Sequence, residues 1–325
     1  MSVPPATRSR PDRRPHRAAL AVLSTLIAAA VLVACGGGGD ADAEHDHDHD
    51  EVSIDTAGRL ATIESGTTAL RIHDLDAGTV EATHTLAHVP SALAASPQRR
   101  YALAMQRTQD GVQFVDGGVF QEDHGDHLHD YRQASRLLGW TLAGPRPTHY
   151  DVQAGRQAAV FMDGDAASTP VRNAGVRLLT DAAIGAGAPV ASLDLAAPIH
   201  GLAEPVDDKL LAVARAADAA DALPTHLSLH RRSGTTWTFD RTLPTRCDGM
   251  HGSFSSGAST VAGCIGGMLL VRHTGATTVD DGRLLATPLR VGTLVGHARL
   301  PDQFVGIATE GAAPGVVTPR FYALD

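Results

Sequence analysis

One strand-like segment recurs six times along this 325-residue chain, and the repeat limits the fold more than any other feature. Each copy is a short apolar run that is followed by a turn and a second apolar run. The copies begin 42, 56, 52, 50 and 44 residues apart, at Arg59–Glu64, Tyr101–Gln106, Gln157–Asp163, Lys209–Arg215, Ser259–Cys264 and Gln303–Thr309. A unit of about fifty residues with three or four short antiparallel strands is typical of a β-propeller blade.

The sequence therefore predicts an all-β fold, a β-propeller over residues 52–325. Six blades fit the repeat best, and five to seven blades are the range we consider. Turns rich in Gly, Pro, Asp and Ser separate the apolar runs, and no long stretch has helical periodicity. A single-domain sandwich or a β-helix is the structural alternative.

The first 34 residues have the features of a secretory signal. Five arginines precede an apolar run from Ala18 to Val33, which is too short to span a bilayer comfortably. The run ends in Leu-Val-Ala-Cys35, which resembles a bacterial lipobox, so we predict lipidation of Cys35. An ordinary signal peptide cleaved nearby is the alternative. In both cases we expect export to the periplasm or cell envelope. With Cys35 lipidated, the lipid would be the one membrane attachment.

Residues 35–51 are expected to form a flexible arm, because four glycines are followed by alternating Asp and His with nothing to bury. The arm carries His45, His47 and His49 as candidate metal ligands. Without residues 1–34 the chain has 22 basic and 35 acidic side chains, a net charge near −13. Such a surface repels nucleic acid and attracts cations, so we expect no nucleic-acid partner.

A second histidine cluster, Glu122–His129, lies in the body of the chain. Its candidate ligands are His124, His127, His129 and Asp126, and we expect the histidines to fold over the central channel of the propeller and complete a site there. Asp126, or Asp123 in its place, would either bind the metal or orient an imidazole. Imidazole and carboxylate together suit zinc, although histidine sites also bind copper and nickel. The cluster lengthens the 56-residue interval, so we expect an insertion on the loop face of the propeller. A solvated acidic loop is the alternative.

Three isolated histidines recur at matching places in the repeat. His149, His200 and His251 lie 8, 9 and 8 residues before the aligned strands of their blades. Equivalent positions in successive blades face the same region around the axis, so we expect the three imidazoles to meet at the mouth of the central channel as zinc ligands. The alternative is that they only satisfy backbone groups in a polar channel.

Cys247 and Cys264 flank the His251 segment. In an exported chain such a pair indicates a disulfide, which would stiffen that segment. Ligation of zinc by the two thiolates is the alternative.

These motifs resemble the AztD family from about Gly58 to the C-terminus. The resemblance is carried by the Glu122–His129 octapeptide, Pro-Thr-His149, His200-Gly and the Cys247–Cys264 block with its Met-His-Gly. It implies a periplasmic zinc chaperone of β-propeller fold, associated with a zinc ABC transporter and passing zinc to the transporter's solute-binding protein. The lipobox departs from the freely soluble form of that family.

We therefore expect a monomeric zinc metallochaperone and not an enzyme. The channel histidines would form the tight site, and the arm a weaker site that captures or hands over the ion. Two alternatives stay open. A metal-dependent hydrolase or lactonase would need an open coordination position and a base such as Glu122, Asp123 or Asp126. A lipoprotein scaffold would bind another protein and use its histidines only incidentally.

Overall fold

The computed structural model describes residues 54–123, 125, 128–219, 222–274, 278–297, 299–311 and 317–324. Contacts divide the chain into residues 1–49 and 50–325, and all described residues belong to the second unit. The predicted lipidation at Cys35 and the arm histidines His45, His47 and His49 lie outside the described residues, as do His124, Asp126 and His127. The predicted domain boundaries stay predictions.

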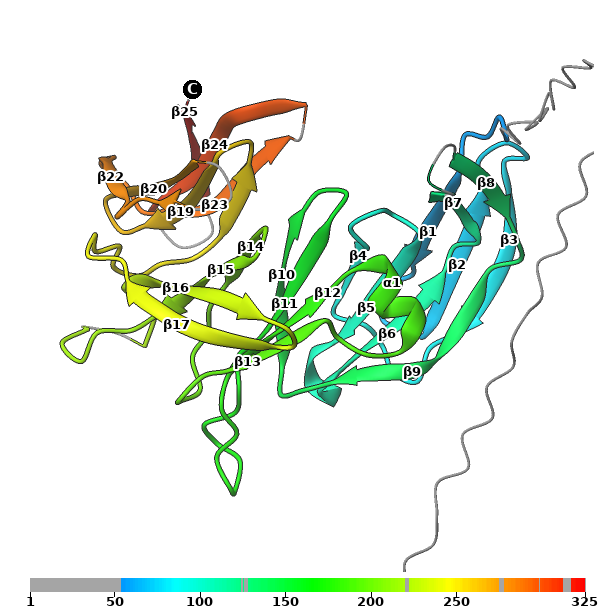
Figure 1. Ribbon diagram of the computed structural model, residues 1–325, viewed down its shortest axis with the longest axis horizontal. Helices are drawn as coiled ribbons and strands as arrows, with labels where there is room; N and C mark the ends of the chain where they lie inside the picture. Colours follow the sequence, from blue (N-terminus) through cyan, green and yellow to red (C-terminus); the bar gives the residue numbers. More distant parts are fainter. Residues whose placement is uncertain are drawn as a thin grey trace, which may run out of the picture. The chain divides into compact units, whose positions relative to one another are not determined.

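Six antiparallel sheets of three or more strands follow one another along the described chain (Figure 1). The first sheet contains β1 (Arg59–Ile63), β2 (Ala69–Asp74) and β3 (Thr79–Thr85). The second contains β4 (Ala92–Ala95), β5 (Tyr101–Gln106), β6 (Gly111–Asp116) and β9 (Arg136–Ala143). The third contains β10 (Pro147–Gln153), β11 (Gln157–Met162), β12 (Gly175–Leu179) and β13 (Ala191–Asp194).

The fourth sheet contains β14 (Ala203–Val206), β15 (Lys209–Ala214), β16 (His226–Ser233) and β17 (Thr236–Thr242). The fifth contains β18 (Ser253–Ser256), β19 (Ser259–Cys264), β20 (Gly267–Thr274), β21 (Thr278–Val279) and β22 (Arg283–Ala286). The sixth contains β23 (Val291–His297), β24 (Leu300–Gly311) and β25 (Val317–Leu324). Consecutive strands pair in chain order, as in propeller blades, which confirms the all-β propeller prediction. The number of blades stays a prediction.

The aligned segments of the repeat occupy equivalent places. Five of them form the second strand of their sheets, namely β5, β11, β15, β19 and β24. β5, β11 and β19 are buried at every position, because other sheets cover both of their faces. A strand covered on both faces needs a continuous apolar or small-residue run and not an alternating one, which explains the sequence of these segments.

Apolar contacts join each sheet to the next. Leu70 of the first sheet packs in one cluster with Val115 of the second. Phe114 of the second packs with Val160 of the third. A larger cluster joins the third, fourth and fifth sheets, and another joins the fifth and sixth. Burying one such side chain contributes roughly 1.5–3 kcal/mol, so these contacts fix the relative positions of neighbouring sheets. They also bring the first strands of the third, fourth and fifth sheets, β10, β14 and β18, into contact.

The insertion that lengthens the second repeat is a hairpin of β7 (Val119–Asp123) and β8 (Leu128–Arg132). It is inserted where β6 ends and β9 begins, and Asp116 pairs there with Arg136. At the opposite end of these strands, where β9 ends beside Gly111, residues 144–146 lead into β10. The hairpin contacts the first sheet, because Arg132 bonds to Asp74 and Asp76.

Helical structure is limited in the described residues to α1 (Asp181–Ala186) and the 3-10 turn η1 (Arg107–Gln109). α1 connects β12 to β13, with Thr180 as its N-cap. Neither is long and apolar enough to cross a membrane, and no other helix occurs in the described ranges.

The predicted disulfide is present. Cys247 and Cys264 are bonded, with their Cα atoms 5.1 Å apart, and both side chains are buried in the cluster that joins the third, fourth and fifth sheets. Since both sulfur atoms are in the bond, neither is available as a zinc ligand. The bond ties the segment before β18 to the end of β19.

Replacing both cysteines by serine should lower the free energy of unfolding by about 3 kcal/mol, because the bond closes a loop with a sequence separation of 17 residues. Urea denaturation of the exported, oxidised protein and of the variant measures the difference. The wild type in reductant is the control and should resemble the variant. Equal midpoints at equal denaturant dependence would show that the bond contributes nothing.

Candidate metal centre

His149, His200 and His251 come together as predicted, and each comes from a different sheet. His149 lies in β10, while His200 and His251 directly precede β14 and β18. One ring nitrogen of each lies within 4.8 Å of the others, and the ring centroids are 5.0–5.4 Å apart. Within the described residues, no other group of three histidine, cysteine or acidic side chains is this close. We call these three residues the histidine triad.

A buried carboxylate orients His200. Asp163 Oδ2 lies 2.9 Å from Nδ1 of His200 and 2.7 Å from the guanidinium of Arg107. Burial raises the pKa of Asp163, but the hydrogen bonds and charges of His200 and Arg107 outweigh it, so the pKa lies below its ordinary value. An ionised carboxylate on Nδ1 leaves Nε2 of His200 to face the triad, which is how many metal-binding histidines are held.

A backbone carbonyl orients His251 in the same way. Nδ1 of His251 lies 2.8 Å from the carbonyl oxygen of Gly292 in β23. Because a carbonyl oxygen only accepts hydrogen bonds, Nδ1 must carry the proton, and Nε2 keeps its lone pair. His251 is therefore fixed in the tautomer that can bind a metal through Nε2.

His149 completes the triad in a less polar place. Its Nε2 lies 3.4 Å from Nε2 of His200. Burial, followed by the positive charge that His200 and His251 can carry, lowers the pKa of His149 to about 4. His149 is therefore neutral near pH 7, as a metal ligand must be.

Glycine follows two of the three histidines for steric reasons. A Cβ on Gly201 would lie 2.3 Å from Cγ2 of Val213. Gly252 has a φ of +70°, and a Cβ there would lie 2.7 Å from the Gly292 oxygen that holds His251. At each His-Gly pair a neighbouring strand, β15 for Gly201 and β23 for Gly252, therefore passes too closely for a side chain on the glycine.

The sequence did not identify Asp163, Arg107 or Gly292 as parts of the site. Asp163 gave a weak signal, because it is the one acidic residue that ends a copy of the aligned segment in the second to sixth repeats. Arg107 and Gly292 gave none, since their contacts cross 56 and 41 residues of chain.

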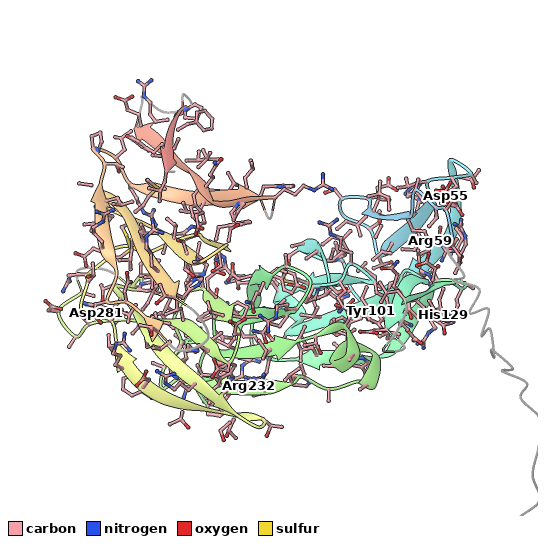
Figure 2. All side chains as sticks on the ribbon, turned by 45° about the horizontal axis from the view of Figure 1, so that its top comes forward. Asp55, Arg59, Tyr101, His129, Arg232 and Asp281 are labelled. Atoms are coloured by element: carbon pink, nitrogen blue, oxygen red, sulfur yellow. A yellow bond between two sulfur atoms is a disulfide. The ribbon has the colours of Figure 1, made fainter. Side chains whose placement is uncertain are left out.

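His129, the one described histidine of the octapeptide, does not lie at the triad. His129 lies on β8, with its ring centroid 6.4 Å from that of Tyr131. Figure 2 shows His129 on the same side of the domain as Arg59 and Tyr101. The hairpin is inserted at one end of β6 and β9, whereas β10, with His149, follows from the opposite end of β9. The sequence argument placed the insertion in the correct repeat but did not consider at which end of the strands it leaves the sheet.

The metal-free protein should become less stable as the pH falls from about 6.5 to about 4. In this window His149 stays neutral when folded, whereas the unfolded chain binds a proton with an ordinary histidine pKa. The contribution is fully present above pH 6.5, and at most about 3 kcal/mol is lost by pH 4. Urea unfolding of the wild type and of His149→Gln between pH 7 and pH 4 tests this. The variant should lose stability less steeply, and parallel curves would contradict the assignment.

Comparisons with known proteins agree with the motifs. No family model matches the chain. A curated relative, the zinc chaperone AztD of Citrobacter koseri, is 27% identical over 221 residues, which are 67% of this chain and 49% of the relative. The match therefore spans about half of that protein.

Solved structures show the same relationship in the fold. Apo AztD from Citrobacter koseri has a TM-score of 0.62 at 22% identity, covering 80% of this chain and 70% of that one. A second Citrobacter koseri AztD structure has a TM-score of 0.60 at 22% identity, covering 78% and 67%. The chain is thus AztD-like in sequence and fold, which confirms the resemblance seen in its motifs.

Proposed function

We propose that this protein is an extracytoplasmic zinc metallochaperone that holds zinc at the histidine triad and passes it to the solute-binding protein of a zinc ABC transporter. The observation that carries the proposal is the convergence of three imidazoles, two of them held through Nδ1 so that Nε2 faces the others. Similarity to a protein named as a zinc chaperone supports the same role.

The triad suits zinc in geometry. Nitrogen ligands about 2.0–2.1 Å from a tetrahedral zinc ion lie about 3.3–3.4 Å from one another. The Nε2 atoms of His149 and His200 are already 3.4 Å apart, and His251 lies within 4.8 Å. Zinc bound by the triad would replace the hydrogen bond between these two nitrogens. Only a small movement of His251 is then needed.

Three protein ligands leave the fourth position of a tetrahedral zinc ion open. A ligand from a receiving protein can enter there before any histidine leaves, so the ion never has to be free in solution. Asp163, which is hydrogen-bonded to His200 and Arg107 through Oδ2, holds His200 in position for this exchange.

The arm and the octapeptide are assigned supporting roles in this proposal. His45, His47 and His49 would form a weaker site that captures zinc or hands it over, with neighbouring carboxylates attracting the cation. His124, Asp126, His127 and His129 would bind zinc separately from the triad, at the hairpin. The disulfide fits an oxidising compartment outside the cytoplasm, with lipidated Cys35 as the membrane anchor.

Zinc titration of the metal-free mature chain against a competing chelator tests the site. His200→Ala and His251→Ala should each weaken the tight site at least 100-fold, because two nitrogen ligands bind zinc far less strongly than three. The triple substitution His45→Ala, His47→Ala and His49→Ala should remove only a weaker site. His129→Ala is the matched control and should keep the tight site. Unchanged affinity in both triad variants would remove the triad from the proposal.

Transfer is tested by mixing the zinc-loaded protein with a metal-free solute-binding protein from a zinc ABC transporter. We expect zinc to reach the acceptor faster than it dissociates into a strong chelator, because ligands exchange one at a time. The arm variant should transfer more slowly at unchanged tight affinity. If the transfer rate equals the dissociation rate into the chelator, the protein stores zinc but does not deliver it directly.

A further inference from the structure

A second group of polar side chains lies beyond the triad, on the strands β10, β14 and β18. Alternate residues of a strand point to the same face, so Asp151 shares the face of His149 in β10. Ser253 and Ser255 stand at the corresponding places after His251. At about 3.3 Å per residue, two residues along a strand correspond to about 7 Å. The group is therefore separate from the triad.

These side chains line a common cavity. Asp151, Glu204, Ser253 and Ser255 surround a space of about 330 Å³, with Arg99 and His297 also on its wall. Asp151 and Glu204 come from adjacent strands β10 and β14, and Asp151 Oδ2 accepts a hydrogen bond of 3.3 Å from the backbone of Ala203. The cavity thus has two carboxylates and two hydroxyls on its wall and room for water molecules.

Glu204 is 1% exposed. The hydroxyls of Ser253 and Ser255 lie near enough to interact with its carboxylate. Within the described residues, however, neither carboxylate oxygen makes a hydrogen bond of normal distance and angle, and neither does the Ser253 hydroxyl. No ion pair joins Arg99 to Asp151 or Glu204 in the described part of the chain. Burial raises the pKa of both Glu204 and Asp151, because a charged carboxylate is costly away from water. The two carboxylates must therefore be neutralised, either by protons or by a bound cation.

We propose that Asp151 and Glu204 bind a divalent cation of the kind that prefers oxygen ligands, such as Ca²⁺, Mg²⁺ or Mn²⁺. The two carboxylates supply its charge-neutralising ligands, and the hydroxyls of Ser253 and Ser255 together with water complete its coordination. Hard cations take carboxylate, hydroxyl and water oxygens, whereas the triad offers only nitrogen. This inference is independent of the proposed zinc function.

Binding of Mn²⁺ to the metal-free mature chain, followed by electron paramagnetic resonance, tests the site. The wild type should bind one more Mn²⁺ ion than Glu204→Gln or Asp151→Asn, and Ca²⁺ should displace that ion. Both variants keep the size of the side chain and remove only its charge. We therefore expect both to fold, and the same loss of one Mn²⁺ ion in each. Glu64→Gln, the same change at an exposed residue, is the matched control and should bind as the wild type does.

Equal Mn²⁺ stoichiometry and affinity in the wild type and both variants would overturn the proposal, and would mean that the two carboxyls are satisfied by protons. The double variant His149→Ala, His200→Ala separates this site from the triad. It should lose tight zinc binding and keep the Mn²⁺ site, so failure of either proposal leaves the other measurable.

Discussion

The packing of the third, fourth and fifth sheets against one another is the contact on which the metal centre depends. The three histidines lie far apart in sequence, and among the described residues no hydrogen-bonded strand pair joins the sheets that carry them. The shared apolar cluster, which includes Phe161, Leu211 and Leu269, sets the distances between β10, β14 and β18, together with hydrogen bonds between sheets such as that from the Ala203 amide to Asp151. Non-directional burial thus produces ring-nitrogen positions that are defined to within a few ångströms.

Directional contacts then refine what the packing provides. The carboxylate of Asp163 and the carbonyl of Gly292 each hold one imidazole by Nδ1, and the disulfide ties down the segment that carries His251. Because tight local geometry excludes a side chain at Gly201 and Gly252, the strands can approach closely beside the imidazoles. These contacts restrict the rings or the segments that carry them, so the arrangement that a metal ion would need is present in the fold itself.

The sequence predicted the parts of this structure that repeat. The aligned segments gave the strands and the blade-like order, and the spacing of His149, His200 and His251 from those segments gave the triad. The sequence could not assign roles to Asp163, Arg107 or Gly292. Each of their contacts occurs once in the chain and joins residues of different sheets, so no repeated pattern reveals it. The expectation that the octapeptide folds over the channel stays a prediction, and it lacked information on the end of the strands at which the insertion leaves the sheet. A count of residues between strands does not contain that information.

The contacts of the triad reach far beyond the three sheets that carry it. Arg107 follows β5 of the second sheet, Asp163 follows β11 of the third, and Gly292 lies in β23 of the sixth. No single repeat holds enough of the centre to bind an ion, so copying one blade during evolution could extend the fold but could not duplicate the site. The centre is a property of the assembled domain, and it can be inherited only as a whole.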